Sequence, residues 1–232
     1  MFKARLRALP IAMVAIVFAS VLASPAQAAA TKYPLTIKFG GYTTKIAKKP
    51  TKIISLSPSA TEILYAVGAG SQILAVDNLS NYPANAPVSE ISAFEPSVEA
   101  ILAKKPDLVL LSIDSTKAPQ IRNALVKLGI PVLMEKAPAT LKDVYAENTL
   151  LARVTDRQAG AVKLNASMAK SIKEILAKAK KSSKIRIFHE LDDTYYSVTS
   201  NTFIGKVYKD FGLINIADKA AGADSYGYPQ LS

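Results

Sequence analysis

The chain has 232 residues, of which 50% are hydrophobic, and its 29 Lys and Arg residues outnumber 18 Asp and Glu residues. The formal net charge is +11 at pH 7, and the chain contains one histidine and no cysteine. This composition excludes disulfides, thiolate metal sites and a catalytic thiol, so the fold must rest on an ordinary apolar core.

Residues 1–28 are predicted to be a cleaved secretory signal peptide. Lys3, Arg5 and Arg7 form a basic leader, residues 8–22 are almost wholly apolar, and a cleavage site with small residues follows. The apolar run is short for a membrane span of about 20 residues, which favours cleavage over an uncleaved anchor. With no cysteine available for lipid modification, we expect a periplasmic protein or, alternatively, a secreted one.

Residues 29–50 are expected to form an N-terminal hairpin around Gly40-Gly41, and residues 51–139 an α/β lobe. A capping box from Ser59 to Glu62 is expected to begin the lobe's first helix. Short apolar strands alternate with helices, which implies a parallel sheet covered on both faces. We expect strands at 53–57, 73–76, 107–112 and 131–134, and further helices at 98–105 and 121–129.

Residues 140–182 form a helical segment with two expected helices. Thr140 with Asp143 caps the first helix, and Thr155-Asp156 begins the second, which continues to about Lys181. Apolar residues at three- and four-residue steps form one stripe on the second helix: Ala161, Leu164, Met168, Ile172, Ile175, Leu176 and Ala179. This pattern predicts a strut that joins two lobes and rests against both.

Residues 170–186 contain a cluster of basic residues and a single acid, Glu174. Its members are Lys170, Lys173, Lys178, Lys180, Lys181, Lys184 and Arg186. Such a cluster can indicate nucleic-acid binding. Export and the separation of the aromatic residues from the lysines favour a solvated helix face instead, so no nucleic-acid partner is expected.

Residues 183–232 are expected to form a partial C-terminal α/β lobe. Residues 184–191 indicate a strand, and Ser200 or Asn201 is expected to cap a helix that ends at Gly212. One convincing strand cannot supply a parallel sheet with helices on both faces. The predicted fold class is therefore α/β, with two Rossmann-like lobes (parallel sheets flanked by helices) joined by one long helix, the second lobe being incomplete.

The loops after the strands combine aromatic and small polar residues, which suits a large, mostly apolar ligand with a few polar handles. Catalysis has little support, because the only base available to Ser57 or Ser59 is His189, which lies inside a strand pattern. Asp192 and Asp193 are adjacent loop acids, which more often solvate or cap than catalyse. No catalytic residue and no intrinsic metal site are expected, and the sequence also lacks a carboxylate cluster for calcium.

Several motifs resemble those of class III (helical-backbone) periplasmic solute-binding proteins, which deliver ferric siderophores, haem or cobalamin to ABC importers. The first-lobe motifs are KIISLSPSATEILYAVGAG, AVDNLSNYP, EPSVEAILAKKPDLVLLS and LGIPVL; RIFHELDDTYYSVTSNTFIG and INIAD to YPQLS resemble the start of the second lobe. The resemblance covers residues 51–232. It implies that the ligand lies between two lobes, with one wall formed by Ser57, Pro58, Ser59, Tyr82 and Phe94, and the opposite wall by Tyr195, Tyr196 and Asn201.

Each of these aromatic residues also has a structural interpretation. Tyr82 and Phe94 would pack in the core under that alternative, and one of Tyr195 and Tyr196 is expected to be a core residue. The resemblance further implies that Glu99 docks on the permease, whereas an acid in a first helical turn is also favoured by the helix dipole. A second docking acid would lie beyond PQLS, and we therefore expect the chain to be truncated.

The resemblance implies a substrate-binding component of an ABC import system with no intrinsic cofactor. Its partners would be the permease subunits and one metal chelate (cobalamin, a ferric siderophore or haem), and the protein would be a monomer. Cobalamin is slightly preferred, because the second wall has no evident arginine cluster for carboxylate-rich siderophores. Two alternatives stay open: an exported α/β hydrolase-like enzyme that uses a serine, and a ligand-free envelope scaffold.

Overall fold

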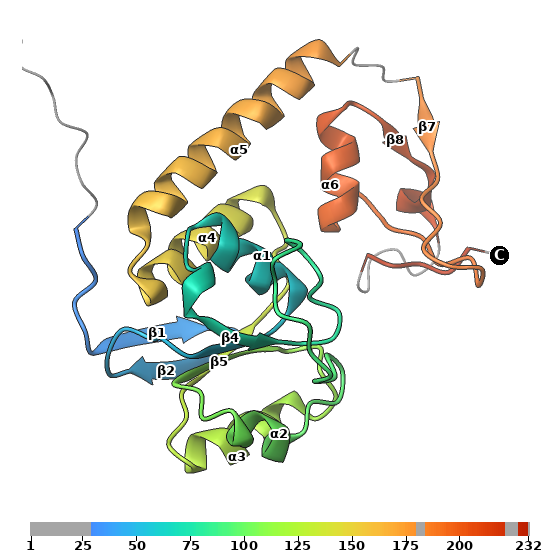
Figure 1. Cartoon of the computed structure of the whole chain (residues 1–232). Coiled ribbons are helices and arrows are strands. Elements are labelled where there is room, and N and C mark those ends of the chain that lie inside the picture. The colour runs from blue at the N-terminus through green and yellow to red at the C-terminus, as the bar shows by residue number, and fades with distance from the viewer. Residues whose placement is uncertain (1–28, 180–183, 221–226, 232) are drawn as a thin grey trace, which may run out of the picture.

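The computed structural model describes residues 29–179, 184–220 and 227–231, and the predicted signal peptide lies outside these residues. Figure 1 shows a first α/β lobe, the long helix α5 and a smaller C-terminal unit, following one another along the chain. Within these described ranges, no helix combines the length and apolar character that a membrane span requires.

An antiparallel hairpin opens the described chain. Strand β1 (Leu35–Phe39) pairs with β2 (Tyr42–Ile46), and Gly40 and Gly41 turn the chain with φ of +56° and +81°. Positive φ at both central residues is the geometry that matches the twist of a two-residue hairpin. Thr44 Oγ1 donates a 2.6 Å hydrogen bond to the carbonyl of Val132, which fastens the hairpin to the main sheet.

The main sheet has four parallel strands in the order β4-β3-β5-β6. Its strands are β3 (Ile53–Leu56), β4 (Ile73–Val76), β5 (Leu108–Ser112) and β6 (Val132–Glu135). Side chains alternate between two cores: Ile53 packs in one and Ile54 in the other. The continuously apolar strands predicted that both faces of the sheet are buried, and this prediction is confirmed.

Helices cover both faces of this sheet (Figure 1). The helices α1 (Pro58–Ala66) and α4 (Leu141–Thr155) lie on one side, where Leu64 and Leu151 join the same core as Ile53. The helices α2 (Val98–Ala103) and α3 (Ala118–Lys127) lie on the other, and a 3₁₀ turn, η1 (Gly70–Gln72), leads into β4. The α/β architecture of the first lobe matches the expectation.

Two predicted helix starts are wrong. Ser57, and not Ser59, caps α1 and accepts a hydrogen bond from the Ala60 amide at 3.5 Å. The helix begins earlier because Pro58, with its fixed φ and no N–H, suits the first helical position. In the second unit, Thr202 caps α6 (Phe203–Asp210) in place of Ser200 or Asn201, because Ser200 instead bonds Asp218 through its amide and hydroxyl.

The turn between α4 and α5 (Gln158–Lys178) also differs from the prediction. Thr155 and Asp156 end α4 instead of beginning α5, and Asp156 adopts the left-handed conformation with φ of +59°. The Asp156 carboxylate accepts hydrogen bonds from the Thr31 amide (2.7 Å) and Lys49 Nζ (3.3 Å). It is therefore engaged with the N-terminal segment and does not cap α5.

The first turns of α5 lie close against the first lobe. A Cβ added at Gly160 would come within 2.1 Å of the Val67 carbonyl oxygen, and Leu164 packs against the core. Farther along the predicted apolar stripe, Ile175 is 56% exposed. The contact predicted for the stripe is thus clear at its beginning, whereas Ile175 lies largely uncovered.

The C-terminal unit is small. Its described part contains α6, the 3₁₀ turn η2 (Ile216–Lys219) and two parallel strands, β7 (Arg186–Ile187) and β8 (Ile214–Asn215). The strand predicted for residues 184–191 is wrong in length, because β8 pairs with it over only two residues. Lys206 Nζ donates to the Ala139 carbonyl at 3.1 Å and so connects this unit to the loop before α4.

Candidate ligand-binding site

The carboxyl ends of the four parallel strands bring the first predicted wall to one edge of the sheet. Ser57 follows β3 and is buried, whereas Pro58 and Ser59 are exposed, and the Ser57 and Ser59 hydroxyl oxygens lie 3.0 Å apart. The Thr61 hydroxyl lies beneath them, 3.0 Å from the Ser57 carbonyl and 3.1 Å from Ser80 Oγ. This buried network holds the turn in one conformation.

Tyr82 and Phe94 project from loops at the same edge, with 63% and 62% of their surfaces exposed. Core packing, the structural alternative for both residues, is therefore wrong. The backbone that carries Phe94 is well fixed, because its carbonyl accepts from the Thr116 amide at 2.7 Å, and Ser115 Oγ donates to Ala93 at 2.8 Å. The loops thus present exposed aromatic area from a rigid base, which suits stacking on a flat ligand.

The second predicted wall lies on the C-terminal unit. Tyr195 and Tyr196 are 62% and 40% exposed, and Asn201 is exposed as well. The expectation that one of the two tyrosines packs in the core is wrong: Tyr195 has φ of +66°, which breaks the side-to-side alternation of an extended chain. Tyr228, which the sequence reasoning missed, is a further exposed aromatic residue beside this segment, next to Pro229, whose carbonyl accepts from the Ser197 amide at 2.9 Å.

The two walls come from separate units, and none of the eight predicted side chains lines any of five cavities found among the described residues. The structure therefore gathers the first-wall residues at one edge and the second-wall residues on another unit. Their joint action on one ligand stays a prediction.

Two buried acids at this edge were missed by the sequence reasoning. Glu135, the last residue of β6, is 6% exposed, and Glu147, in the second turn of α4, is 4% exposed. Burial raises the pKa of Glu135 well above its ordinary value, and the neighbouring Glu147 and Asp77 carboxyls raise it further, while the Ser57 hydroxyl opposes the shift. Two features of the sequence could have indicated these buried acids. Glu135 ends an apolar strand, and Glu147 lies four residues before Leu151, on the buried face of the same helix.

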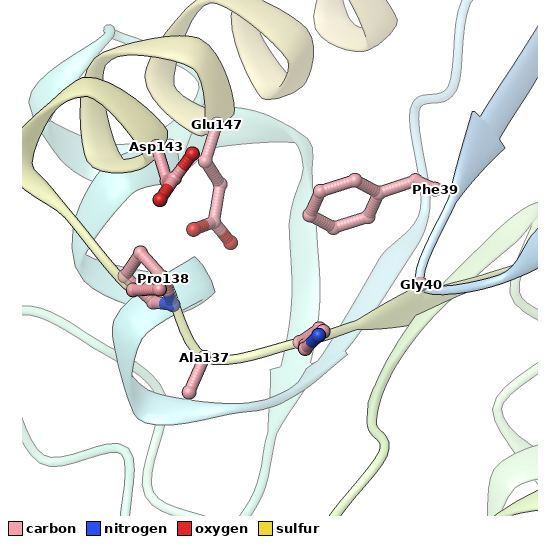
Figure 2. A pocket seen from close by; sticks show the side chains of 8 residues that line it. Phe39, Gly40, Ala137, Pro138, Asp143 and Glu147 are labelled. Atoms are coloured by element: carbon pink, nitrogen blue, oxygen red, sulfur yellow. The ribbon is translucent and has the colours of Figure 1, made fainter. Parts of the chain in front are cut away.

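A cavity of about 250 Å³ lies beside this pair, between the hairpin turn and the start of α4. Figure 2 shows the Glu147 carboxylate directed into it opposite the Phe39 ring, with Asp143 nearby. The lining consists of Phe39, Gly40, Lys136, Ala137, Pro138, Ala139, Asp143 and Glu147. The Thr140 hydroxyl hydrogen-bonds the Asp143 carboxylate and lowers its pKa, so Asp143 remains ionised at neutral pH.

The candidate catalytic groups have local structural partners. His189 Nδ1 lies 2.8 Å from the Tyr208 hydroxyl, and Asp192 accepts from the Thr194 amide at 2.9 Å. Within the part of the chain that the structure describes, no group of three or more His, Cys, Asp or Glu side chains is placed to hold a metal ion.

Glu99 lies exposed in the first turn of α2, which Ser97 caps. Its carboxylate accepts a 2.8 Å hydrogen bond from Ser97 Oγ. A backbone hydrogen bond and this hydroxyl lower the pKa of Glu99, so the side chain presents a stable negative charge.

Comparison with known proteins decides the family, because the model described as "Periplasmic binding protein" matches residues 53–232. The chain belongs to this family. Among solved structures, the chain is similar to a possible iron-binding (periplasmic solute-binding) protein of Staphylococcus epidermidis, with a TM-score of 0.70. The periplasmic vitamin B12 binding protein BtuF of Vibrio cholerae gives 0.63. Each is 25% identical, and the match covers 80% of this chain and 72% of the other.

Two curated relatives show how much of a family member this chain represents. The uncharacterized ABC transporter substrate-binding lipoprotein YvrC of Bacillus subtilis is 31% identical over 81% of this chain and 60% of its own length. The vitamin B12-binding protein of Vibrio parahaemolyticus is 28% identical over 81% of this chain and 67% of its own length. This periplasmic binding protein thus spans less than two thirds of the B. subtilis relative that it matches.

Proposed function

We propose that this periplasmic binding protein is the substrate-binding component of an ABC importer, which captures a metal chelate and presents it to the membrane permease. The observation that carries this proposal is the pair of exposed aromatic residues, Tyr82 and Phe94, on loops at the carboxyl edge of a parallel sheet. Exposed rings on a preorganised edge bury apolar surface when they cover a flat apolar ligand. The names of the relatives indicate the class of that ligand.

Among chelates, cobalamin is the ligand that we propose first. Three observations support it: several relatives are named as vitamin B12-binding or cobalamin-binding proteins, the second wall is rich in tyrosine, and no arginine cluster accompanies it. Haem and ferric siderophores are the other candidates. The chelate is cargo, and the proposed role assigns no intrinsic cofactor and no catalytic step to the protein.

The test is a titration of the full chain with cyanocobalamin, haemin and a ferric siderophore, followed by tyrosine fluorescence. We expect one of the three ligands to quench the fluorescence. Phe94→Ala should lower the affinity for that ligand about tenfold, because stacking of an aromatic ring on a flat ligand contributes on the order of 1 kcal/mol. Val88→Ala, which truncates an exposed apolar residue outside the predicted walls, is the matched control. Equal affinity in both variants would contradict the first wall, and no response to any ligand would contradict the function.

The proposal includes the family's mode of delivery. Glu99 would meet a basic side chain of the permease, the protein would act as a monomer without nucleic acid, and residues 1–28 would direct it outside the cytoplasm. Glu99→Gln should lower permease-coupled uptake without changing ligand affinity, whereas Glu62→Gln, on the exposed part of α1, should change neither. Reduced ligand affinity in Glu99→Gln would contradict a role limited to docking.

A further inference from the structure

Two buried carboxyl groups are neighbours at this edge: Glu135, at the end of β6, and Glu147, in α4, which raises the pKa of Glu135. Neither oxygen of Glu135 has a hydrogen-bond partner among the described residues, and the same holds for Oε1 of Glu147. Two ionised carboxylates in this position would each lose their hydration without compensation and would also repel each other. The pair is therefore stable only with a positive charge or a proton between its members.

The surrounding groups do not supply that charge. Asp77, at the end of β4, adds a further negative charge; its carboxylate accepts hydrogen bonds from the Leu79 amide and the Ser80 hydroxyl, each at 2.8 Å. Ser57, from the turn after β3, carries no charge; its hydroxyl lowers the pKa of Glu135 and lies 3.0 Å from Ser59 Oγ. Among the described residues, the ion pairs found do not include either glutamate.

The adjacent cavity contains one basic and one further acidic side chain. Lys136 and Asp143 line it together with Glu147, and Figure 2 labels the two acids. The described part of the chain has no carboxylate group of three or more placed for a metal ion. A proton, which needs only one oxygen from each glutamate, fits this arrangement better than a metal cation does.

We propose that Glu135 and Glu147 share one proton at neutral pH, so that a carboxylic acid bonded to a carboxylate joins β6 to α4 beneath the ligand-binding edge. The proton comes from solvent and is bound to Glu135, whose carboxylic acid hydroxyl donates a hydrogen bond to the Glu147 carboxylate. The pair retains one negative charge. Burial and the Glu147 charge, which raise the pKa of Glu135, agree with this arrangement. The inference is independent of the ligand and goes beyond solute capture.

A shared proton makes the stability of the protein depend on pH in one direction. When the pH exceeds the ordinary pKa of glutamate, the unfolded chain releases a proton that the folded chain retains. The stabilisation is complete below the unfolded pKa and is lost as the pH rises through the folded pKa. In that window the unfolding equilibrium constant should rise by up to about tenfold per pH unit.

The experiment is urea unfolding of the full chain from about pH 5 to about pH 9, for the wild type and three variants. Glu135→Gln should flatten the rise, because its amide donates to Glu147 without titrating, and Glu147→Gln should also alter it. Asp143→Asn, an exposed acid on the same face of α4, should keep the wild-type slope. Infrared spectra of the wild type at pH 7 should contain the carbonyl band of a protonated carboxylic acid, which Glu135→Gln removes.

Three results would overturn the proposal. The first is a wild-type slope equal to that of Glu135→Gln. The second is a wild-type spectrum without the protonated carbonyl band, a measurement that decides the question even where Glu135→Gln fails to fold. The third is stabilisation by millimolar Ca²⁺ or Mg²⁺ that abolishes the slope and depends on both glutamates, since the pair would then hold a metal cation.

Discussion

Asp156 shows how one residue can set the connection between elements. Its left-handed backbone ends α4, and its carboxylate accepts hydrogen bonds from the Thr31 amide and Lys49 Nζ. The side chain thus fastens the segment before β1 to the turn between two helices, more than a hundred residues later. The hydrogen bond from Thr31 is the main cause that lowers the pKa of Asp156 below its ordinary value.

Replacement of Asp156 should therefore affect stability mainly above the acid range. Asp156→Asn keeps a residue that tolerates positive φ but loses the charge, and we expect it to cost on the order of 1 kcal/mol or less, because the pair with Lys49 is partly exposed. A lowered folded pKa gives stability that is present above the unfolded pKa and is lost as the pH falls through the folded one. Urea unfolding at neutral and acidic pH checks this, with the difference from wild type shrinking in acid; a difference that grows in acid would contradict it.

The residue scale is also where sequence reasoning is weakest. Sequence reasoning missed Glu135, because its neighbouring carboxyl group, Glu147, comes from another element. Caps fail for a related reason: several hydroxyl residues stand before α1 and α6, and tertiary contacts such as Ser200 with Asp218 decide which of them is free. In contrast, the prediction that Tyr82 and Phe94 lie in loops at strand ends is correct. The apolar run of the preceding strand is easy to recognise in the sequence.

At the scale of elements, the four strands of the first lobe lie within about a residue of their predicted positions, because uninterrupted apolar runs between helices fit only buried parallel strands. The strand predicted at 184–191 failed, since a strand needs a partner that a local pattern cannot provide. The helix α5 was predicted nearly in full, but the covering of its stripe depends on which elements pack against it.

The close approach of α5 to α1 gives a prediction for a single methyl group. A Cβ on Gly160 would lie 2.1 Å from the Val67 carbonyl oxygen, so Gly160→Ala forces the two elements apart. We expect it to destabilise the protein by roughly 1–3 kcal/mol, the usual cost of overpacking, although alanine is the better helix former. Ala169→Gly, at an exposed position on α5, measures the propensity effect alone and should cost about 1 kcal/mol.

At the scale of the whole molecule, the stabilising contacts are distributed unevenly. The two apolar cores consist of residues from the hairpin, the first lobe, α4 and the beginning of α5. In the described C-terminal unit, the buried positions include Val198 and Ala217 beside polar residues such as Ser197 and Asn215, and β7 pairs with β8 over two residues. A hydrogen bond from Lys206 to the Ala139 carbonyl links this unit to the loop before α4.

This distribution predicts that the C-terminal unit opens at a lower free energy than the first lobe. Amide hydrogen exchange should be slowest in β3 and β5, which are paired on both sides, and much faster in β7 and β8, which open locally. A ligand that binds both walls would add contacts between the units and slow the exchange of β7 and β8, leaving β3 and β5 little changed. Equal protection of the two units without ligand would contradict the uneven distribution. Slowing confined to the first lobe on ligand addition would show that the second wall takes no part in binding.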